Sequence, residues 1–362
     1  MKIAILYPRI SHYREEFFQG LMKKHDLTFF LYESKEESLK KNFKNSQIDA
    51  HFLKTFTLLN KIRFVNILPF FKTKYDVLIL IGEMRSISVW MLLILMKMSK
   101  TKTILWGHGI SVHAYLKEEK KLNPLRVLFH KLADHTWLYT KKEVEIWKDY
   151  ISQEKFTSLN NTIYIEEILN EPLFDKIELK NKYNITTEIN LIFAARFSNP
   201  NRRADLLVEV IKKLDSTKYG LIIIGDGGLK PNFEHYKNVY DFGALYDRRL
   251  KTELFQIADI YFQPGWMGLS CTEALAYGKP VLTFERSKTL KQCVEFAYLN
   301  NENSFIAKDI DDLITFIHSL DKQSIKKYSS NAKMYAEKNL TMETMVNNAL
   351  DSLTKITKKV NL

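Results

Sequence analysis

The stretch Val77-Leu78-Ile79-Leu80-Ile81 is an unbroken run of apolar residues. A strand buried on both faces, as in a parallel sheet covered by helices, has this composition. Outward from it, strand-like and helix-like segments alternate through the first half of the chain. Strand character recurs at 2–7, 27–32, 103–106 and 136–139, and helical spacing at 12–23. This alternation predicts a parallel, doubly wound sheet.

A second alternation begins after a weak region at 166–179, where Glu171-Pro172 interrupts any helix. Strands are expected at 190–195, 220–225, 260–263 and 280–284, and helices at 205–214, 253–258 and 272–277. The sequence therefore predicts an α/β protein with two tandem Rossmann-like domains, at 1–168 and 169–341. An amphipathic C-terminal helix at 342–362 can pack back on the first domain. Ligands are expected beyond the carboxyl ends of the strands, facing the cleft between the domains.

Composition excludes several classes of protein. The 362 residues are 46% hydrophobic, enough for two cores, and the two cysteines, Cys271 and Cys293, cannot form a disulfide scaffold. No Cys/His spacing resembles a zinc site. The apolar run from Ile87 to Met96 is too short to span a bilayer, which needs about 20 residues, and is expected to form a buried helix. The N-terminal segment lacks the layout of a signal peptide, so a reducing cytosol is the expected location.

The formal net charge of +12 favours a polyanionic partner, or reflects a lysine-rich surface. Residues 52–74 contain five basic residues, several aromatic residues and no acidic residue. Such a stretch is typical of a segment that lies on an anionic membrane, or of an ordinary helix packed on the sheet. The sequence favours neither interpretation over the other.

Four features follow successive strands of the second half. The first contains Arg196 and, at the start of the next helix, Arg202 and Arg203, whose guanidinium groups suit a diphosphate. The glycine-rich turn Gly225-Asp226-Gly227-Gly228 and the glycine Gly243 are the second and third. The fourth, Gln263–Val281, has a glycine-bearing loop that leads into a short helix with Glu273 in its first turn. An alternative for this helix is a capping box with Ser270 as the N-cap.

In this order and spacing, the four features resemble the retaining glycosyltransferases of family four, which have the GT-B fold. The resemblance covers nearly the whole chain and is densest from 191 to 282. It implies that Arg196 with Arg202 or Arg203 holds the donor diphosphate, and that Glu273 binds the ribose. It also implies that Gly268, Leu269 and Ser270 present backbone amides to the phosphates. The donor-binding set is completed by Gly225, Asp226, Gly243 and Gly265.

The sequence departs from this family pattern at two places. The family has two glutamates eight positions apart, the first of which contacts the donor sugar; here the first position is Gly265 and the second is Glu273. The loop that carries Arg202 and Arg203 is about one residue longer than usual, which leaves open which arginine matches the family's basic pair. The Pro264-Gly265 version resembles a subgroup found in surface-polysaccharide biosynthesis.

The first half adds residues to the expected site. Trp106-Gly107-His108-Gly109 ends a strand, and the resemblance implies that His108 contacts the donor sugar and supports the reacting centre. A packed structural histidine is the alternative. Residues Arg9, His12, Tyr13 and Arg14 lie in a loop that enters a helix, and they are expected on the acceptor side. Asn160-Asn161-Thr162-Ile163 resembles the family's segment that ends the first domain.

These observations predict a glycosyltransferase that moves a sugar, with retention, from a UDP- or GDP-linked donor to a glycan or lipid-linked glycan. No side chain is an evident nucleophile, so arginines and helix amides are expected to stabilise the departing diphosphate without a metal or cofactor. The one Asp-x-Asp triplet, Asp309-Ile310-Asp311, resembles a helix start. A catalytically weak nucleotide-sugar binding protein, a nucleotide-sugar 2-epimerase and a nucleic-acid-binding protein are the alternatives. The inner face of the plasma membrane is the alternative location.

Overall fold

A computed structural model describes residues 1–33, 48–59 and 61–358 of the chain. The chain divides into two compact units, of which unit 1 comprises Met1–Tyr164 with Met342–Leu362 and unit 2 comprises Ile165–Thr341. The division falls at 164/165, close to the predicted 168/169. The region at 166–179, where the sequence pattern is weak, contains the helix α8 (Glu166–Leu169) and the start of α9 (Lys176–Lys182).

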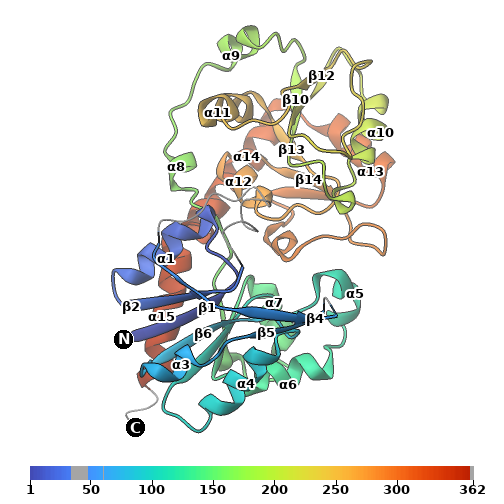
Figure 1. The fold of residues 1–362 in the computed structure, drawn as a ribbon. Coiled ribbons are helices and arrows are strands. Elements are labelled where there is room, and N and C mark those ends of the chain that lie inside the picture. Colours follow the sequence, from blue (N-terminus) through green and yellow to red (C-terminus); the bar gives the residue numbers. More distant parts are fainter. Residues whose placement is uncertain (34–47, 60, 359–362) are drawn as a thin grey trace. The chain divides into compact units, whose positions relative to one another are not determined.

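Unit 1 contains a parallel sheet of seven strands in the order β3-β2-β1-β6-β7-β8-β9 (Figure 1). Every predicted strand of the first half is present within one residue of its expected bounds. The strands are β1 (Lys2–Tyr7), β2 (Asp26–Leu31), β3 (His51–Phe52), β6 (Val77–Ile81), β7 (Lys102–Trp106), β8 (His135–Leu138) and β9 (Phe156–Ser158).

Helices cover both faces of this sheet, which explains why its strands are apolar throughout. Alternate strand residues pack in two cores. One core includes Phe17 of α1 and Leu353 of α15, and the other includes Leu92 of α4 and Phe129 of α6. The helices are α1 (Glu15–Met22), α3 (Pro69–Lys72), α4 (Ile87–Met96), α5 (Tyr115–Glu118), α6 (Pro124–Leu132), α7 (Lys141–Trp147) and α15 (Met342–Lys358). A single turn of 3-10 helix, η1 (His12–Arg14), precedes α1.

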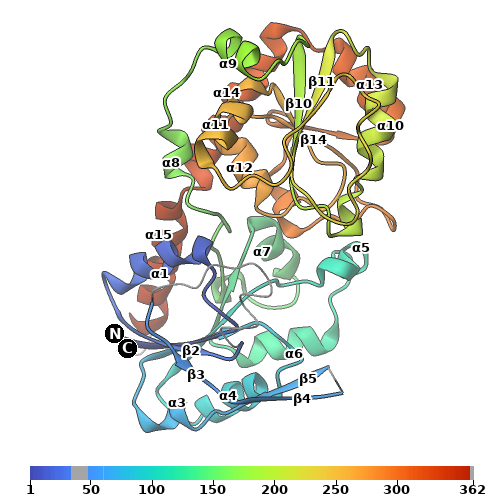
Figure 2. The same ribbon diagram turned by 45° about the horizontal axis from the view of Figure 1, so that its top comes forward.

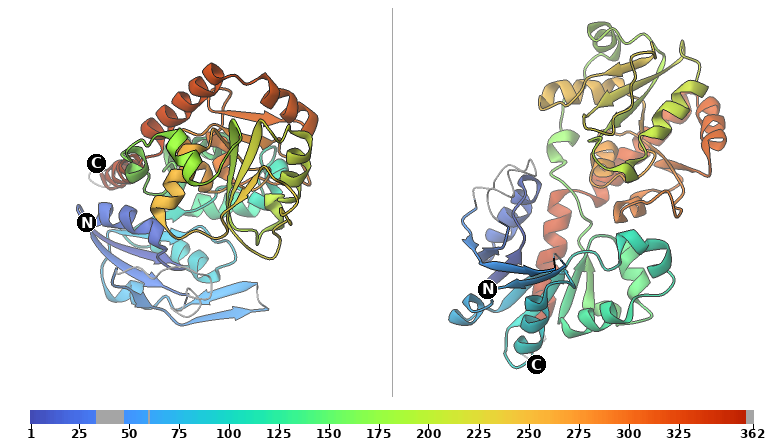
Figure 3. Two further views of the ribbon diagram at one scale, coloured as in Figure 1. Left: turned by 90° about the horizontal axis from the view of Figure 1, so that it is seen from above. Right: turned by 45° about the vertical axis from the view of Figure 1, so that its right-hand side comes forward.

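Two expectations for unit 1 are corrected by the structure. Residues 52–74 do not form the ordinary helix packed on the sheet that was one of the two interpretations, because they contain the antiparallel hairpin of β4 (Thr55–Leu58) and β5 (Ile62–Val65), followed by the short α3. Figure 3 shows this hairpin at the edge of unit 1. The run at 87–96 does form a helix, α4, but only one of its faces is buried.

Unit 2 contains a parallel sheet of six strands in the order β12-β11-β10-β13-β14-β15 (Figure 2). Its strands are β10 (Ile189–Ala194), β11 (Tyr219–Ile224), β12 (Val239–Asp241), β13 (Ile260–Phe262), β14 (Val281–Phe284) and β15 (Ser304–Ala307). The remaining helices are α10 (Asp205–Lys213), α11 (Arg248–Ile257), α12 (Ser270–Ala276), α13 (Ile310–Ser319) and α14 (Lys322–Asn339). Apolar residues of α10 and α13 pack against one face of the sheet. The prediction of two Rossmann-like domains is therefore confirmed.

The Asp-x-Asp triplet begins a helix, as predicted. The side chain of Asp309 accepts a hydrogen bond from the backbone N–H of Asp312 and caps α13. Asp311 pairs with Lys213 at 2.6 Å. Both carboxylates therefore have partners that stabilise the helix and its contact with α10.

Candidate functional site

The strand order of unit 2 marks where a ligand can bind. The chain proceeds from β10 outward through β11 and β12, and then crosses back to β13 and continues the other way to β15. The loops that follow β10 and β13 therefore leave neighbouring strands in opposite directions. A crevice forms at such a switch point, beyond the carboxyl ends of the strands. Arg196 follows β10 and Gly265 follows β13, so the strongest sequence signals fall at this point.

The loops after β10 and β13 are fastened together through their backbones. Gly265 N–H donates to the carbonyl oxygen of Arg202 at 3.1 Å, and Trp266 N–H donates to that of Asn201 at 2.9 Å. A Cβ atom on Gly265 would lie well inside 3.0 Å of the Asn201 carbonyl oxygen. The backbone of the loop that carries Arg202 thus occupies the space in which a side chain at position 265 would begin. A glutamate cannot fit there without moving that loop.

Arg202 is held beside Arg196. One guanidinium nitrogen of Arg202, Nη1, donates to the Arg196 carbonyl oxygen at 2.7 Å. Burial lowers the pKa of Arg202, and the positive charge of Arg196 acts in the same direction. The Arg202 guanidinium is partly desolvated and lies near a second positive charge. Such a group favours an anionic partner.

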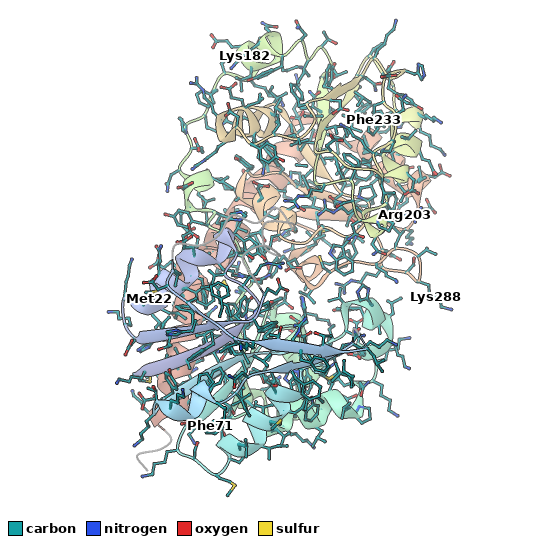
Figure 4. The ribbon with its side chains drawn as sticks, viewed as in Figure 1. Met22, Phe71, Lys182, Arg203, Phe233 and Lys288 are labelled. Atoms are coloured by element: carbon teal, nitrogen blue, oxygen red, sulfur yellow. The ribbon has the colours of Figure 1, made fainter. Side chains whose placement is uncertain are left out.

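Arg203 is directed to a different partner. Its backbone is in the left-handed region, with φ of 54°, and its guanidinium forms a bidentate pair with the carboxylate of Asp205 at 2.6 to 3.0 Å. Arg203 is labelled in unit 2 in Figure 4. Because Asp205 already neutralises Arg203, the geometry favours Arg202 as the second arginine beside Arg196. The sequence left open whether Arg202 or Arg203 acts with Arg196, and the geometry favours Arg202.

The glycine-rich turn after β11 packs tightly on the loop that carries Arg196. A Cβ atom on Gly225 would collide with the carbonyl oxygen of Ala195, and φ at this glycine is 139°. Phe197 N–H donates to the Asp226 carbonyl oxygen at 2.9 Å, and Gly225 N–H donates to that of Gly243 at 2.7 Å. The loops after β10, β11 and β12 therefore support one another, and Gly225 is required by this packing.

Helix α12 begins at Ser270, so the capping box with Ser270 as N-cap is wrong. The N-cap is Leu269, and the hydroxyl of Ser270 donates to the carbonyl oxygen of Met267. The N–H of Gly268 donates to the sulfur of the buried Cys293 at 2.8 Å. Burial raises the pKa of Cys293 well above its ordinary value, so this sulfur is a neutral thiol.

Glu273 lies in the first turn of α12 and is paired. Its Oε1 atom accepts a hydrogen bond from Lys251 Nζ of α11 at 2.5 Å, and both side chains are partly buried. A carboxylate held by one lysine retains its second oxygen as an acceptor for hydroxyl groups. The sequence did not single out Lys251 or Cys293, because no motif relates their positions to the glycine loop.

In unit 1, His108 lies on a loop that is fixed on both sides. The neighbouring Gly109 N–H donates to Glu143 Oε1 at 2.9 Å, and the Gly109 carbonyl oxygen accepts from Trp147 Nε1 at 3.1 Å. The half-buried His108 ring meets the Tyr139 ring edge to face, with centroids 4.4 Å apart. This loop follows β7, at the carboxyl edge of the unit 1 sheet. The imidazole is therefore presented on a rigid support.

The four residues expected on the acceptor side differ in their surroundings. Arg9 forms an ion pair with Glu33, whereas His12 is exposed and Tyr13 is half-buried. Arg14 is only 3% exposed, and its guanidinium donates to the Asn161 side chain and to the carbonyl oxygen of Thr162 at 3.2 Å. Arg14 thus connects the start of α1 to the segment that ends the first Rossmann-like half.

Within the described residues, no group of three or more His, Cys, Asp or Glu side chains could hold a metal ion. No helix of the described segments is long and apolar enough to cross a membrane. A small apolar pocket in unit 2, lined by residues such as Ile260, Leu282 and Phe305, lies at the amino ends of the strands. It is therefore at the opposite edge of the sheet from the candidate site.

The model of the family described as glycosyl transferases group 1 matches residues 175–338, which lie in unit 2. No curated protein matches the chain in sequence. Among solved structures, HepE from Anabaena in complex with UDP has a TM-score of 0.70 at 14% identity, covering 98% of this chain and 100% of that chain. A glycosyltransferase from Rickettsia africae has a TM-score of 0.65 at 15% identity, with 99% and 98% covered.

A third similar structure is a candidate UDP-N-acetylglucosamine 2-epimerase from Listeria monocytogenes. Its TM-score is 0.61 at 13% identity, with 99% of this chain and 97% of that chain covered. At these identities the three structures show that this chain has the two-domain GT-B fold. Because this fold hosts both transferases and epimerases, the reaction has to be argued from the site.

Proposed function

We propose that the protein is a glycosyltransferase that takes a sugar from a nucleoside diphosphate sugar bound by unit 2. The observation that carries this proposal is the hydrogen bond from the Arg202 guanidinium to the backbone carbonyl oxygen of Arg196, at the switch point of the unit 2 sheet. The match of 175–338 to group 1 glycosyl transferases covers this site, and HepE, which has the same fold, was solved with UDP and with UDP-glucose. These findings support UDP as the first donor nucleotide to test.

Each residue has a role that its surroundings allow. Arg196 and Arg202 bind the diphosphate, and they stabilise the negative charge that develops on it as the bond to the sugar breaks. Glu273 accepts hydrogen bonds from the ribose hydroxyls through the oxygen that Lys251 leaves available. His108 contributes to the reacting centre, as the resemblance to family four implies. Retention follows the same resemblance, with the acceptor approaching the face from which the diphosphate departs.

The acceptor and the biosynthetic pathway are further parts of the proposed function. A glycan or lipid-linked glycan is the proposed acceptor, and surface-polysaccharide biosynthesis is the proposed pathway. Arg9, His12 and Tyr13 are the proposed acceptor-side residues, whereas Arg14 supports them from the interior. The proposed reaction needs no metal or cofactor, because the two arginines supply the positive charge that a metal supplies elsewhere.

A catalytically weak nucleotide-sugar binding protein is a second candidate, and Gly265 is the observation that favours it. At this position no side chain can reach the donor sugar, so substrate could bind without the contacts that promote its reaction.

The deciding experiment incubates the full chain with a panel of UDP- and GDP-linked sugars, with and without a chelator, and follows nucleotide release by mass spectrometry. The proposal expects release with at least one sugar, insensitivity to the chelator, and loss of turnover in Arg196→Ala. Nucleotide binding without release from any donor would favour the second candidate. Conversion of a donor to its 2-epimer would identify an epimerase, and absence of nucleotide binding would contradict both proposals.

A further inference from the structure

Helix α4 in unit 1 has an apolar outer face. No charged residue occurs from 87 to 96, and Val89, Leu92 and Leu93 pack on the sheet. The opposite side is also apolar, since Ile94 is 54% exposed and Met98, just after the helix, is 91% exposed. A helix that covers a sheet in water normally has polar residues on its outer face. The outer face of α4 therefore has the composition of a surface that is buried against a binding partner.

The elements beside α4 extend this surface. The hydroxyl of Ser88 in α4 accepts from Val65 N–H at 2.7 Å and donates to the Val65 carbonyl oxygen at 2.8 Å, which fixes the β4–β5 hairpin next to the helix. Figure 2 shows α3, α4, α6 and the hairpin on one side of unit 1, and Figure 4 labels Phe71 of α3 there. We define the apolar face of unit 1 as the exposed residues Phe56, Leu58, Leu59, Leu68, Phe71, Ile87, Met91, Ile94, Leu95, Met98, Leu125 and Leu128.

The apolar face of unit 1 has twelve exposed large apolar residues on adjoining elements, which is more than isolated exposed side chains account for. Single exposed apolar side chains are normal on a soluble protein, but contiguous patches mark interaction sites. The exposed fractions are 62% for Phe56, 81% for Leu59 and 67% for Leu68. Because side chains this exposed make few internal contacts, they do not contribute much to the core, and an external partner is needed to explain them.

Basic residues accompany the apolar face. The exposed lysines on the same elements and their connections include Lys54, Lys61, Lys72, Lys74, Lys97, Lys100 and Lys131. The sequence from 84 to 117 contains no acidic residue. Of the acidic residues that flank α6, Glu118 pairs with Arg126 at 2.9 Å and Asp134 pairs with Lys97 at 2.8 Å, whereas Glu119 is exposed. Of the two acidic residues between 50 and 83, Glu83 pairs with Arg63 at 2.6 Å, and Asp76 accepts from the backbone N–H of Lys2 at 2.8 Å. The surface is thus apolar with a positive border.

We propose that the apolar face of unit 1 docks on an anionic lipid bilayer. Its apolar side chains enter the boundary between headgroups and acyl chains, and the lysines contact lipid phosphates. The charge distinguishes this partner from a second copy of the chain. A two-fold dimer would bring the face against itself and oppose one set of lysines with another, which is unfavourable. An anionic bilayer instead complements both the apolar residues and the positive charge.

The test measures co-sedimentation of the full chain with vesicles of phosphatidylcholine and phosphatidylglycerol in a 70:30 ratio, against vesicles of phosphatidylcholine alone. Binding is expected only to the anionic vesicles, with a fall of about tenfold or more between 0.1 M and 1 M salt. Equal binding to both vesicles, or binding to neither, would overturn the proposal. This readout is independent of donor turnover, so its failure leaves the proposed glycosyltransferase function untouched.

Two pairs of matched variants locate the surface. Met91→Gln/Ile94→Gln and Lys61→Glu/Lys74→Glu should each weaken partition by about tenfold or more, because each lysine near an anionic surface is worth about fivefold. The apolar control is Leu173→Gln/Ile177→Gln, at side chains 88% and 71% exposed in unit 2. The charge control is Lys326→Glu/Lys327→Glu in α14. All four variants change exposed residues, and circular dichroism melting checks their fold.

Equal losses in test and control variants would refute the location of the surface. Sedimentation velocity without vesicles tests whether the wild type is a dimer. If it is, and if Met91→Gln/Ile94→Gln dissociates that dimer, the apolar face of unit 1 binds a second copy of the chain, and the proposal is also overturned.

Discussion

At the scale of single residues, the backbone of Asn201 fills the space that a side chain at Gly265 would occupy. The carbonyl oxygen of Asn201 accepts from Trp266 N–H and lies where a Cβ atom of residue 265 would be. The residue type at position 265 and the path of the arginine loop are therefore coupled. The consequence for recognition is that neutral backbone groups, in place of a carboxylate, lie at this position.

Replacing Gly265 by alanine tests this coupling. The added methyl group forces the Asn201 backbone away, so Gly265→Ala should reduce the free energy of unfolding by about 1 to 3 kcal/mol, as overpacking does. The control is Gly228→Ala, because a Cβ atom there meets nothing within 4 Å and φ is ordinary. Urea unfolding of both variants measures the difference. Equal stability of Gly265→Ala and Gly228→Ala would show that the two loops are not in contact.

Glu273 offers a second test, aimed at the ribose. If its carboxylate accepts ribose hydroxyls, the wild type should bind UDP about tenfold more tightly than 2′-deoxy-UDP, because one charged hydrogen bond is worth about 1.5 kcal/mol or more. In Glu273→Gln this preference should largely disappear. Isothermal titration calorimetry measures all four affinities. A preference that survives the substitution would assign ribose recognition to another residue.

The sequence identified several residues of the candidate site, but not all of them. Arg196 directly follows an apolar strand and Glu273 lies in the short helix after another, and the resemblance to family four implied the roles of both. Cys293 and Lys251 were missed because their relation to the site is purely tertiary. Cys293 reaches Gly268 from 25 residues away, and Lys251 reaches Glu273 from another helix, 22 residues away. No local pattern records such contacts.

At the scale of elements, strands were predicted well and the segment at 52–74 was not. Buried parallel strands are continuous apolar runs, so β1 and β6 were predicted with their observed bounds. The β4–β5 hairpin has β4 fully exposed, and a strand with no buried face lacks the alternation that identifies strands. Its turn places Leu59 at φ of 51°, a conformation that leucine rarely adopts and no sequence rule predicts.

Helix α6 contains a buried histidine that makes unit 1 sensitive to acid. His130 is 3% exposed, and burial lowers its pKa to about 3, with Arg126 and Lys155 acting in the same direction. In the unfolded chain the pKa is near its ordinary value of 6.5. Between these two pKa values the unfolded state binds the extra proton, so the stability of the folded state falls as the pH falls below about 6.5.

From pH 7 to pH 5, His130 should remove about 2 kcal/mol from the free energy of unfolding. His130→Gln keeps a polar group beside Thr136 but does not titrate. The free energy of unfolding of this variant should therefore fall by about 2 kcal/mol less than that of the wild type between pH 7 and pH 5. Tryptophan fluorescence in urea is a suitable probe, because Trp90, Trp106, Trp137 and Trp147 all lie in unit 1. Identical pH dependence in wild type and variant would contradict this account of His130.

At the scale of the whole molecule, two Rossmann-like sheets are built from one chain that returns to its starting unit. Helix α15, at the end of the chain, packs on α1, and Trp137 Nε1 donates to Ser352 Oγ at 2.6 Å. The amphipathic pattern predicted this helix, but only the structure shows which residues it contacts. In both sheets the proposed site residues lie in loops that follow strands: His108 after β7, Arg196 after β10 and Gly265 after β13.

The most direct test of the central claim is the affinity of the full chain for UDP, with GDP in parallel, measured by calorimetry in wild type, Arg202→Ala and Arg203→Ala. We predict that one of these nucleotides binds, and that Arg202→Ala weakens binding by about 10- to 100-fold, since it removes a charged contact to the diphosphate. Arg203→Ala should change the affinity by less than about threefold, because Asp205 already neutralises Arg203. Absence of binding to both nucleotides, or an equal loss in the two variants, would contradict the proposed site.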